Sequence, residues 1–158
     1  MECEYFGGVD LSLNSAGVII LDFNYNIQIQ KVITSKVEDE IDIRINDIVN
    51  SILSIFLPYK DKLSVNIEGL SFFVSKSQRG LQLAGLHYVL RNYLFTHSIP
   101  FEITPPTSLK KYITGKGTSN KNIIIKEIYK RWSVDFDSDD LADAYGLARM
   151  ICSKYNEE

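Results

Sequence analysis

The chain has 158 residues, of which 45% are hydrophobic, and a formal net charge of −3. This length and apolar content predict one domain with a proper core over residues 1–158 and are short for two. The sequence shows no apolar run of membrane-spanning length and no signal-peptide pattern, so we expect a cytoplasmic protein. Cys3 and Cys152 lack metal-ligand spacing, which predicts reduced thiols instead of a zinc site or a disulfide framework.

The basic residues gather in one segment of the chain. Between positions 69 and 131, ten Lys or Arg stand against two Glu, a local net charge of +8 that leaves −11 for the remainder. Phosphate binding depends on a local basic surface and not on the total charge, so this segment is a candidate nucleic-acid surface. For any single lysine, a solvated helix face is an equally good explanation. The DNA-contact candidates in this segment include Lys76, Arg79, Lys111 and Lys116.

Three apolar runs open the chain, over residues 5–11, 17–22 and 26–34. Turn residues 12–15 separate the first two, and the third alternates apolar with polar residues, so we expect three antiparallel strands. Asp10 falls at the end of the first strand. An Asp before a turn often only bonds local backbone, which is the alternative to a functional role.

Residues 40–56 carry apolar side chains at helical spacing and end before Pro58, which predicts an amphipathic helix. Residues 63–68 then form a compact strand. A strand reached through a helical crossover is expected to lie parallel to an earlier strand of the same sheet. If it lies beside the first strand, Glu68 comes next to Asp10, and an acid there is unfavourable when buried without a partner.

The rest of the chain alternates helices with one more strand. We expect a loop over residues 69–77 and then a helix, a short strand, a short helix and two longer helices, over residues 82–96, 100–103, 109–113, 120–131 and 138–154. This order predicts an α/β fold with a mixed sheet. His87 and His97 are expected to be ordinary helix residues and not ligands.

The last predicted helix places Asp140 and Asp143 three residues apart on one face. Like charges that close repel unless solvent spreads them or a cation lies between them. Magnesium prefers oxygen ligands and takes few protein carboxylates, so a divalent cation is one explanation. The other is structural, because acidic residues after a Ser138 N-cap complement the helix dipole.

Two further stretches suggest nucleic-acid contacts. Phe72 and Phe73 precede Lys76 and Arg79, and aromatic residues beside basic ones can stack on bases while the cations hold phosphate. Anchoring of the loop to the core is at least as good a reading of the two Phe. The glycines of segment 114–121 let backbone N–H groups approach a phosphate near a helix N-terminus, without the spacing of a nucleotide P-loop.

Four segments together resemble the motifs of the RuvC-type Holliday junction resolvases in the RNase H-like superfamily, at residues 8–13, 65–68, 110–121 and 140–144. They occur in the family's order and cover nearly the whole chain. The resemblance implies a five-stranded mixed sheet, with strands one to three antiparallel, flanked by α-helices. It also implies a homodimer that binds four-way branched DNA.

By the same resemblance, Asp10, Glu68, Asp140 and Asp143 match the family's four metal-binding carboxylates. Lys110 and Lys121 match basic residues that support catalysis near the scissile phosphate. The implied cofactor is a pair of Mg²⁺ ions, for which Mn²⁺ substitutes, and no nucleotide cofactor is expected. Two such ions can clamp the attacking water and the leaving oxygen of an in-line displacement, and the implied products carry a 5′-phosphate and a 3′-hydroxyl.

The chain departs from the family pattern at two places. Leu11 and Ser12 replace the usual glycine or proline-glycine after Asp10, a variant closer to phage-type members, in which Ser12 or Asn14 is the candidate DNA contact. The aromatic that acts at the junction centre aligns near Ser71, so Phe72 or Phe73 is the candidate substitute. The expected location is therefore the cytoplasm of a bacterial or a phage-infected cell.

Three other functions are compatible with parts of the sequence. A related RNase H-like nuclease would prefer flaps, forks or RNA–DNA hybrids. A non-catalytic junction-binding architectural protein would gain nothing from clustered negative charge beside DNA. An actin-like ATPase also opens with a Gly-Val-Asp strand, but it needs a second comparable domain for which this chain is too short.

Overall fold

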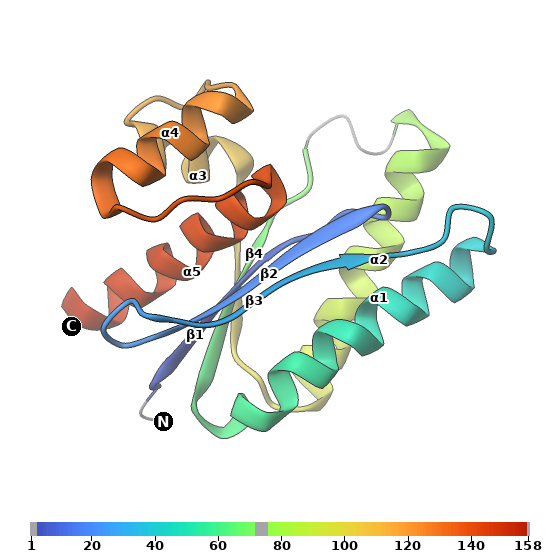
Figure 1. Cartoon of the computed structure of the whole chain (residues 1–158). Helices are drawn as coiled ribbons and strands as arrows, with labels where there is room; N and C mark the ends of the chain where they lie inside the picture. Colours follow the sequence, from blue (N-terminus) through green and yellow to red (C-terminus); the bar gives the residue numbers. More distant parts are fainter. Residues whose placement is uncertain (1–2, 72–75, 158) are drawn as a thin grey trace.

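The computed structural model describes residues 3–71 and 76–157, and its core is a five-stranded sheet (Figure 1). The strands are β1 Tyr5–Asp10, β2 Ser15–Asp22, β3 Ile27–Thr34, β4 Leu63–Glu68 and β5 Phe101–Thr104. The helices are α1 Ile41–Phe56, α2 Gln78–Thr96, α3 Pro106–Thr114, α4 Lys121–Trp132 and α5 Asp139–Glu157.

The sheet has the strand order β3-β2-β1-β4-β5. Strands β1 to β3 are antiparallel, whereas β4 is parallel to β1 and β5 is parallel to β4. This is the five-stranded mixed sheet predicted from the sequence. Helices α1 and α2 cover one face and α5 covers the other, with α3 and α4 packed beyond α5 (Figure 1).

Successive side chains of β4 point to opposite faces of the sheet, so this strand contributes residues to both faces. Val65 and Ile67 are fully buried in the core beneath α1 and α2, together with Phe56. The residues that alternate with them, Asn66 and Glu68, face α5 instead. Because β1 and β4 are parallel neighbours with Val9 opposite Ile67, Glu68 emerges next to Asp10, as the crossover argument predicted.

Helix α5 lies unusually close to the sheet because two strand residues beneath it are glycines. A Cβ atom on Gly8 would lie 1.9 Å from the Ala144 backbone oxygen, and one on Gly17 would lie 2.1 Å from the Asp140 backbone oxygen. No side chain fits in that space. The close approach brings the first turns of α5 down to the ends of β1 and β4.

Several element boundaries differ from the sequence prediction. Helix α2 begins at Gln78, four residues earlier than predicted, because the Ser77 hydroxyl accepts a 3.0 Å hydrogen bond from the Gly80 N–H and caps the helix. Helix α3 begins at Pro106, since proline suits the first helical position. Strand β5 is shifted by one residue, helix α5 reaches Glu157, and a 3₁₀ helix over Leu57–Lys62 was not predicted.

Side-chain contacts join α3, α4 and α5 into one unit. The Arg131 Nη1 atom donates to the backbone oxygens of Tyr112 and Ile113 at 2.6 and 2.7 Å, which ties α4 to the end of α3.

Both cysteines are buried free thiols. None of the helices in the described parts of the chain is long and apolar enough to cross a membrane.

Candidate metal centre

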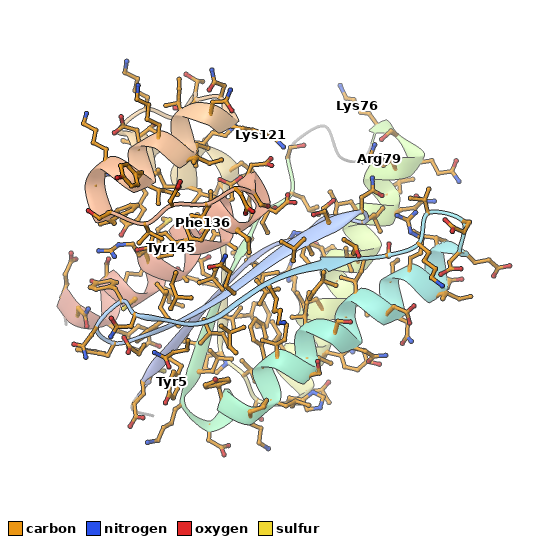
Figure 2. All side chains as sticks on the ribbon, viewed as in Figure 1. Tyr5, Lys76, Arg79, Lys121, Phe136 and Tyr145 are labelled. Atoms are coloured by element: carbon orange, nitrogen blue, oxygen red, sulfur yellow. The ribbon has the colours of Figure 1, made fainter. Side chains whose placement is uncertain are left out.

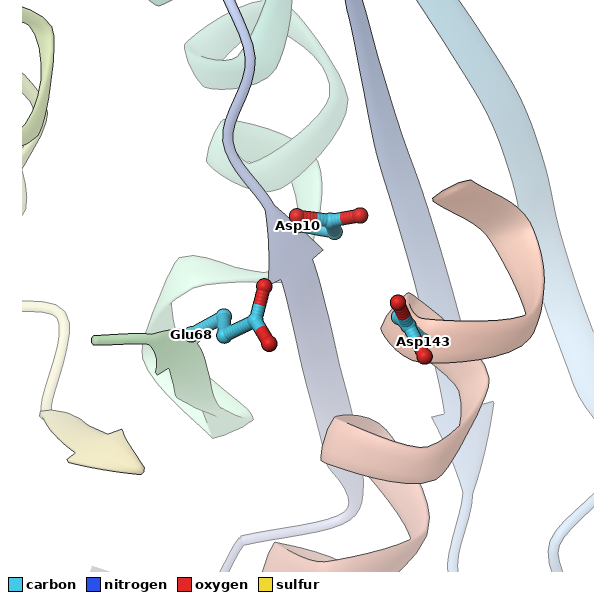
Figure 3. Close-up of side chains that lie close together, drawn as sticks. All are labelled: Asp10, Glu68 and Asp143. Carbon is cyan, nitrogen blue, oxygen red and sulfur yellow. The ribbon is translucent and has the colours of Figure 1, made fainter. Parts of the chain in front are cut away.

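Three carboxylates meet where β1 and β4 end beneath α5 (Figure 3). Asp10 is the last residue of β1, Glu68 is the last residue of β4, and Asp143 lies in the second turn of α5. One carboxylate oxygen from each lies within 4.8 Å of those of the other two. Parallel neighbouring strands end at the same sheet edge, which explains why Asp10 and Glu68 meet, and the glycine-supported approach of α5 adds Asp143.

Burial raises the pKa values of all three acids, and repulsion by neighbouring carboxylates adds to the rise at Asp10 and Asp143. Burial, followed by the charges of Glu68 and Asp143, raises the pKa of Asp10 to about 10. Burial and the Glu68 charge raise the pKa of Asp143 to about 7. Burial also raises the pKa of Glu68, which shares a hydrogen bond with Asp10. Without a cation, Asp10 therefore keeps its proton at neutral pH and Asp143 is only partly ionised.

The donor atoms fit a hard divalent cation. All three residues offer carboxylate oxygens, the ligands that Mg²⁺ and Mn²⁺ prefer. The Asp143 Oδ1 atom is buried without a hydrogen-bond partner, and such an atom is costly unless something else satisfies it. A cation at the cluster would satisfy this oxygen and offset the repulsion that contributes to the raised pKa values of Asp10 and Asp143. The sequence motifs predicted this grouping for Asp10, Glu68 and Asp143.

Asp140, the fourth predicted ligand, lies one turn before Asp143 and outside that group of three. Its Oδ2 atom accepts a 2.5 Å hydrogen bond from the Ser15 hydroxyl at the start of β2. Its charge still contributes to the raised pKa of Asp10. Ser138 accepts a long hydrogen bond of 3.5 Å from the Leu141 N–H, in line with its predicted role as N-cap. A metal-ligand role for Asp140 stays a prediction.

The two lysines predicted to support catalysis lie near the acids. The charges of Lys110 and Lys121 both lower the pKa values of Glu68 and Asp143, which places both ammonium groups within electrostatic range of the cluster. Lys121 forms an ion pair with Asp139, and its side chain is 76% exposed. That pair lowers the pKa of Asp139 and raises the pKa of Lys121.

The other predicted DNA contacts are spread around this site. Lys76, Arg79 and Lys121 project from the same side of the molecule in Figure 2. Lys111 and Lys116 are exposed, and Lys111 lines a hollow with Lys130 and Arg131 between α3 and α4. Phe72 and Phe73 lie outside the described residues.

The turn after Asp10 is held by a residue that the sequence analysis did not single out. Arg44 on α1 donates from Nη2 to the Leu13 backbone oxygen at 2.7 Å and to the Asn14 Oδ1 atom at 2.8 Å. Its Nε atom donates to the Ser35 hydroxyl at 3.0 Å. Ser12 accepts hydrogen bonds from the backbone N–H groups of the turn itself. The side chains of Ser12 and Asn14 thus shape the turn, and their contact with DNA stays a prediction.

Sequence reasoning also missed Ser15 and Asn66. Ser15 was treated only as a turn residue, and nothing local indicates its bond to Asp140, which is 125 positions away. Asn66 offered a weak signal, because it is a polar residue between the apolar Val65 and Ile67, and the structure buries it fully. Both depend on the position of α5 over the sheet, which local sequence patterns do not specify.

Comparison with solved structures relates this arrangement to known proteins, whereas no protein-family model and no curated protein sequence matches the chain. Thermus thermophilus RuvC matches with a TM-score of 0.75 at 13% identity, over 97% of this chain and 95% of that chain. The same protein in complex with a Holliday junction substrate matches with a TM-score of 0.77, over 97% and 94%. The yeast mitochondrial Holliday junction resolvase Ydc2 matches with a TM-score of 0.63 at 13% identity, over 98% and 86%.

This chain has the RuvC fold. The likeness extends over nearly the full length of both chains and confirms the RNase H-like architecture predicted from the four motifs. At 13% identity the likeness concerns the fold, so the chemistry has to be argued from the site. The site is an acidic triad that could bind metal ions.

Metal-free protein is expected to lose stability as pH rises. The pKa of Asp143 is 3.8 in its ordinary state and about 7 in the folded chain, so the folded state binds more protons between these values. The free energy of unfolding then falls as pH rises from about 4 to about 7. Asp10, whose folded pKa is about 10, extends the fall to higher pH.

Chemical denaturation of the protein in EDTA at a series of pH values measures this fall, with Asp143→Asn as the control. The variant should lack the Asp143 contribution, so its stability should fall less between about pH 4 and pH 7 than that of the wild type. Added Mg²⁺ should stabilise the wild type most above pH 7, where the ligands are more readily deprotonated. Equal pH slopes in the two proteins would contradict the raised Asp143 pKa.

Proposed function

We propose that the protein is a metal-dependent endodeoxyribonuclease that resolves four-way DNA junctions. The observation that carries this proposal is the triad of Asp10, Glu68 and Asp143 at the sheet edge of a RuvC fold. A pure junction-binding protein would gain nothing from three clustered, partly buried acids, because negative charge at this position repels DNA. Thermus thermophilus RuvC, which shares this fold, was solved in complex with a Holliday junction, and this supports a four-way junction as the substrate.

In this proposal, Asp10, Glu68 and Asp143 hold the divalent ions, with Asp140 as the fourth ligand and with Mg²⁺ or Mn²⁺ as the ion. When bound, two such ions supply an activated water and stabilise the charge that develops on the phosphate and the leaving oxygen. We assign contact with the same phosphate group to Lys110 and Lys121, and their electrostatic influence on Glu68 and Asp143 supports this. The expected products carry a 5′-phosphate and a 3′-hydroxyl.

We assign the placement of the DNA backbone to cationic side chains near the acids. Lys76 and Arg79 flank the start of α2, and Lys121 projects toward the same side of the molecule (Figure 2). A backbone that passes between these cations crosses the carboxyl ends of β1 and β4, where the acids lie. Contacts of this kind position a nucleic acid but read no sequence, which suits recognition of a branched shape.

Two coordinated nicks require two sites, so we propose a homodimer. Helix α2 supports this with a stripe of three exposed apolar residues at seven-residue spacing, Leu81, Tyr88 and Phe95, which are 59%, 60% and 78% exposed. Residues at this spacing lie on one face of a helix. A second copy would cover the stripe by a two-fold contact, and a two-fold dimer presents identical sites to like-oriented strands.

Charge placed on this stripe should yield monomers. Tyr88→Glu and Phe95→Glu would bury a carboxylate in the proposed contact, so sedimentation velocity should show monomers at concentrations where the wild type is a dimer. Ile123→Glu, on an exposed position of α4, is the matched control and should leave the dimer intact. Dimers in all three variants would contradict the assignment of α2 to the dimer interface.

The preferred substrate distinguishes a junction resolvase from related RNase H-like nucleases. We would compare cleavage of a four-way junction, a flap, a fork and an RNA–DNA hybrid that share one sequence, in the presence of Mg²⁺. The proposal expects nicks in the junction at a rate well above those in the other substrates. Preferential cutting of the flap, fork or hybrid would keep the metal site but assign the protein to another branch of RNase H-like nucleases.

A further inference from the structure

A buried polar pair, Asn66 and Thr104, links the two elements that carry Glu68 and Asp143, β4 and α5, to the neighbouring strand β5. Asn66 is fully buried in β4, two residues before Glu68, and Thr104 is 5% exposed at the end of β5. The Thr104 hydroxyl donates to the Asn66 Oδ1 atom at 2.8 Å. The Asn66 Nδ2 atom donates to the Leu147 backbone oxygen at 3.1 Å, one helical turn after Asp143 on α5.

The two bonds leave the Asn66 side chain only one orientation. Its amide nitrogen must meet the Leu147 carbonyl, because a carbonyl oxygen accepts and cannot donate. Its amide oxygen then accepts the hydrogen bond from the Thr104 hydroxyl. A buried amide held at both ends is expensive to move, because any shift leaves a buried polar atom without a partner.

This geometry couples the positions of two acids. Asn66 and Glu68 lie on the same face of β4, since side chains two residues apart on a strand point the same way. The bond to Leu147 holds α5, and with it Asp143, against that same face. Thr104 also holds the start of the loop that follows β4. Its backbone oxygen accepts a 2.7 Å hydrogen bond from the N–H of Gly69, the residue directly after Glu68.

Packing alone does not require a polar group at position 66. The opposite face of β4 and the surroundings of α5 are apolar, and an apolar side chain of similar size would bury more favourably than an amide that needs two partners. Polar groups that orient metal ligands typically influence metal affinity by about ten- to a hundredfold. The Asn66 side chain forms its hydrogen bonds with Leu147 and Thr104, so we assign it an effect on the acids through α5 and β4.

We infer that Asn66, held by Thr104, is a positioning residue that sets the separation of Glu68 and Asp143 and thereby the affinity of the site for a divalent cation. The inference rests on the proposed function only for its consequence in cleavage. Its direct consequence, metal affinity, is measured on the protein alone. The two can therefore fail separately.

The test compares Thr104→Val with Thr104→Ser, which differ in the hydroxyl that Asn66 needs. Calorimetric titration of the full-length protein with Mn²⁺, without DNA, should show Mn²⁺ binding weakened by about tenfold or more in Thr104→Val and near wild-type affinity in Thr104→Ser. Asn66→Leu, which removes both bonds, should be weakened at least as much. Ser64→Ala is the control, because Ser64 is a buried polar residue on the same strand and face but farther from the acids.

Thermal unfolding in EDTA and cleavage of a four-way junction complete the experiment. We expect Thr104→Val to require more Mn²⁺ for half-maximal cleavage while its junction affinity in EDTA stays that of the wild type. Lower unfolding temperatures with unchanged Mn²⁺ affinity in Thr104→Val and Asn66→Leu would overturn the inference and leave the pair a structural bond. If the wild type binds Mn²⁺ but cuts no DNA, the proposed function fails, and the affinities alone still decide the positioning role.

Discussion

Asp10→Asn, Glu68→Gln and Asp143→Asn are each expected to abolish junction cleavage while the protein still folds and binds the junction. Each substitution keeps the shape of the side chain and removes a ligand charge. Metal ions supply several kcal/mol of transition-state stabilisation, and roughly 1.4 kcal/mol corresponds to a factor of ten in rate, so the cleavage rate should fall by about a thousandfold or more. Single-turnover cleavage in Mg²⁺ and junction binding in EDTA measure the two properties separately.

The metal-free variants should be at least as stable as the wild type near neutral pH. Burial raises the pKa values of all three acids in the folded chain, and the Glu68 charge adds to the rise at Asp10 and Asp143, so replacement of any one acid by an amide removes a charge that the metal-free site disfavours. A second pair of variants, Asp140→Asn and Ser15→Ala, tests the role of Asp140, whose carboxylate accepts the hydrogen bond from Ser15. If Asp140 is the fourth ligand, only Asp140→Asn should approach the loss seen in the triad variants. Loss of folding or of junction binding in all three triad variants would make those carboxylates structural.

Gly8→Ala is expected to destabilise the protein by about 3 kcal/mol or more and to lower cleavage at the same time. The added Cβ would lie 1.9 Å from the Ala144 backbone oxygen and 2.6 Å from the Ala148 backbone nitrogen. Helix backbone cannot yield as a flexible side chain does, so α5 must move away from β1. Because α5 carries Asp143, the movement would also open the triad.

Gly85→Ala is the matched control for this prediction. Gly85 lies inside helix α2, and a Cβ there would meet only the end of the Ile45 side chain at an ordinary 3.6 Å. Alanine is a better helix former than glycine by about 1 kcal/mol, so this variant should be as stable as the wild type or more stable. Denaturant unfolding of both variants checks the pair. A Gly8→Ala protein of wild-type stability would contradict the close approach of α5.

The sheet was predictable because each strand has its own local signal. The first three strands are apolar runs separated by turn residues, and the crossover through α1 explains why β4 lies parallel to β1. The meeting of Asp10 and Glu68 follows from that topology alone. The sequence predicted α2 and α3 to begin later in the chain than they do. Their apolar spacing begins only after the first turn of each helix, and those first turns are specified by Ser77 and Pro106 instead.

The third acid and its supports were harder to predict from sequence. Helical spacing correctly placed Asp140 and Asp143 near one another, but residues three apart differ by about 4.5 Å along the helix axis, so only Asp143 reaches the triad. Which turn of α5 meets β1 depends on the contact at Gly8. The bonds of Ser15, Asn66 and Arg44 likewise join distant elements, and a single sequence carries no signal for such pairs.

The most direct test of the metal-dependent resolvase is cleavage of an immobile four-way junction by the wild-type protein, with each strand end-labelled in turn. The reaction is run with Mg²⁺, with Mn²⁺ and with EDTA, beside a linear duplex of the same sequence. We predict paired nicks at symmetric positions in two like-oriented strands, in either metal and not in EDTA, with the duplex left intact. Binding of the junction without any cutting in either metal would contradict the proposed nuclease and leave a junction-binding protein.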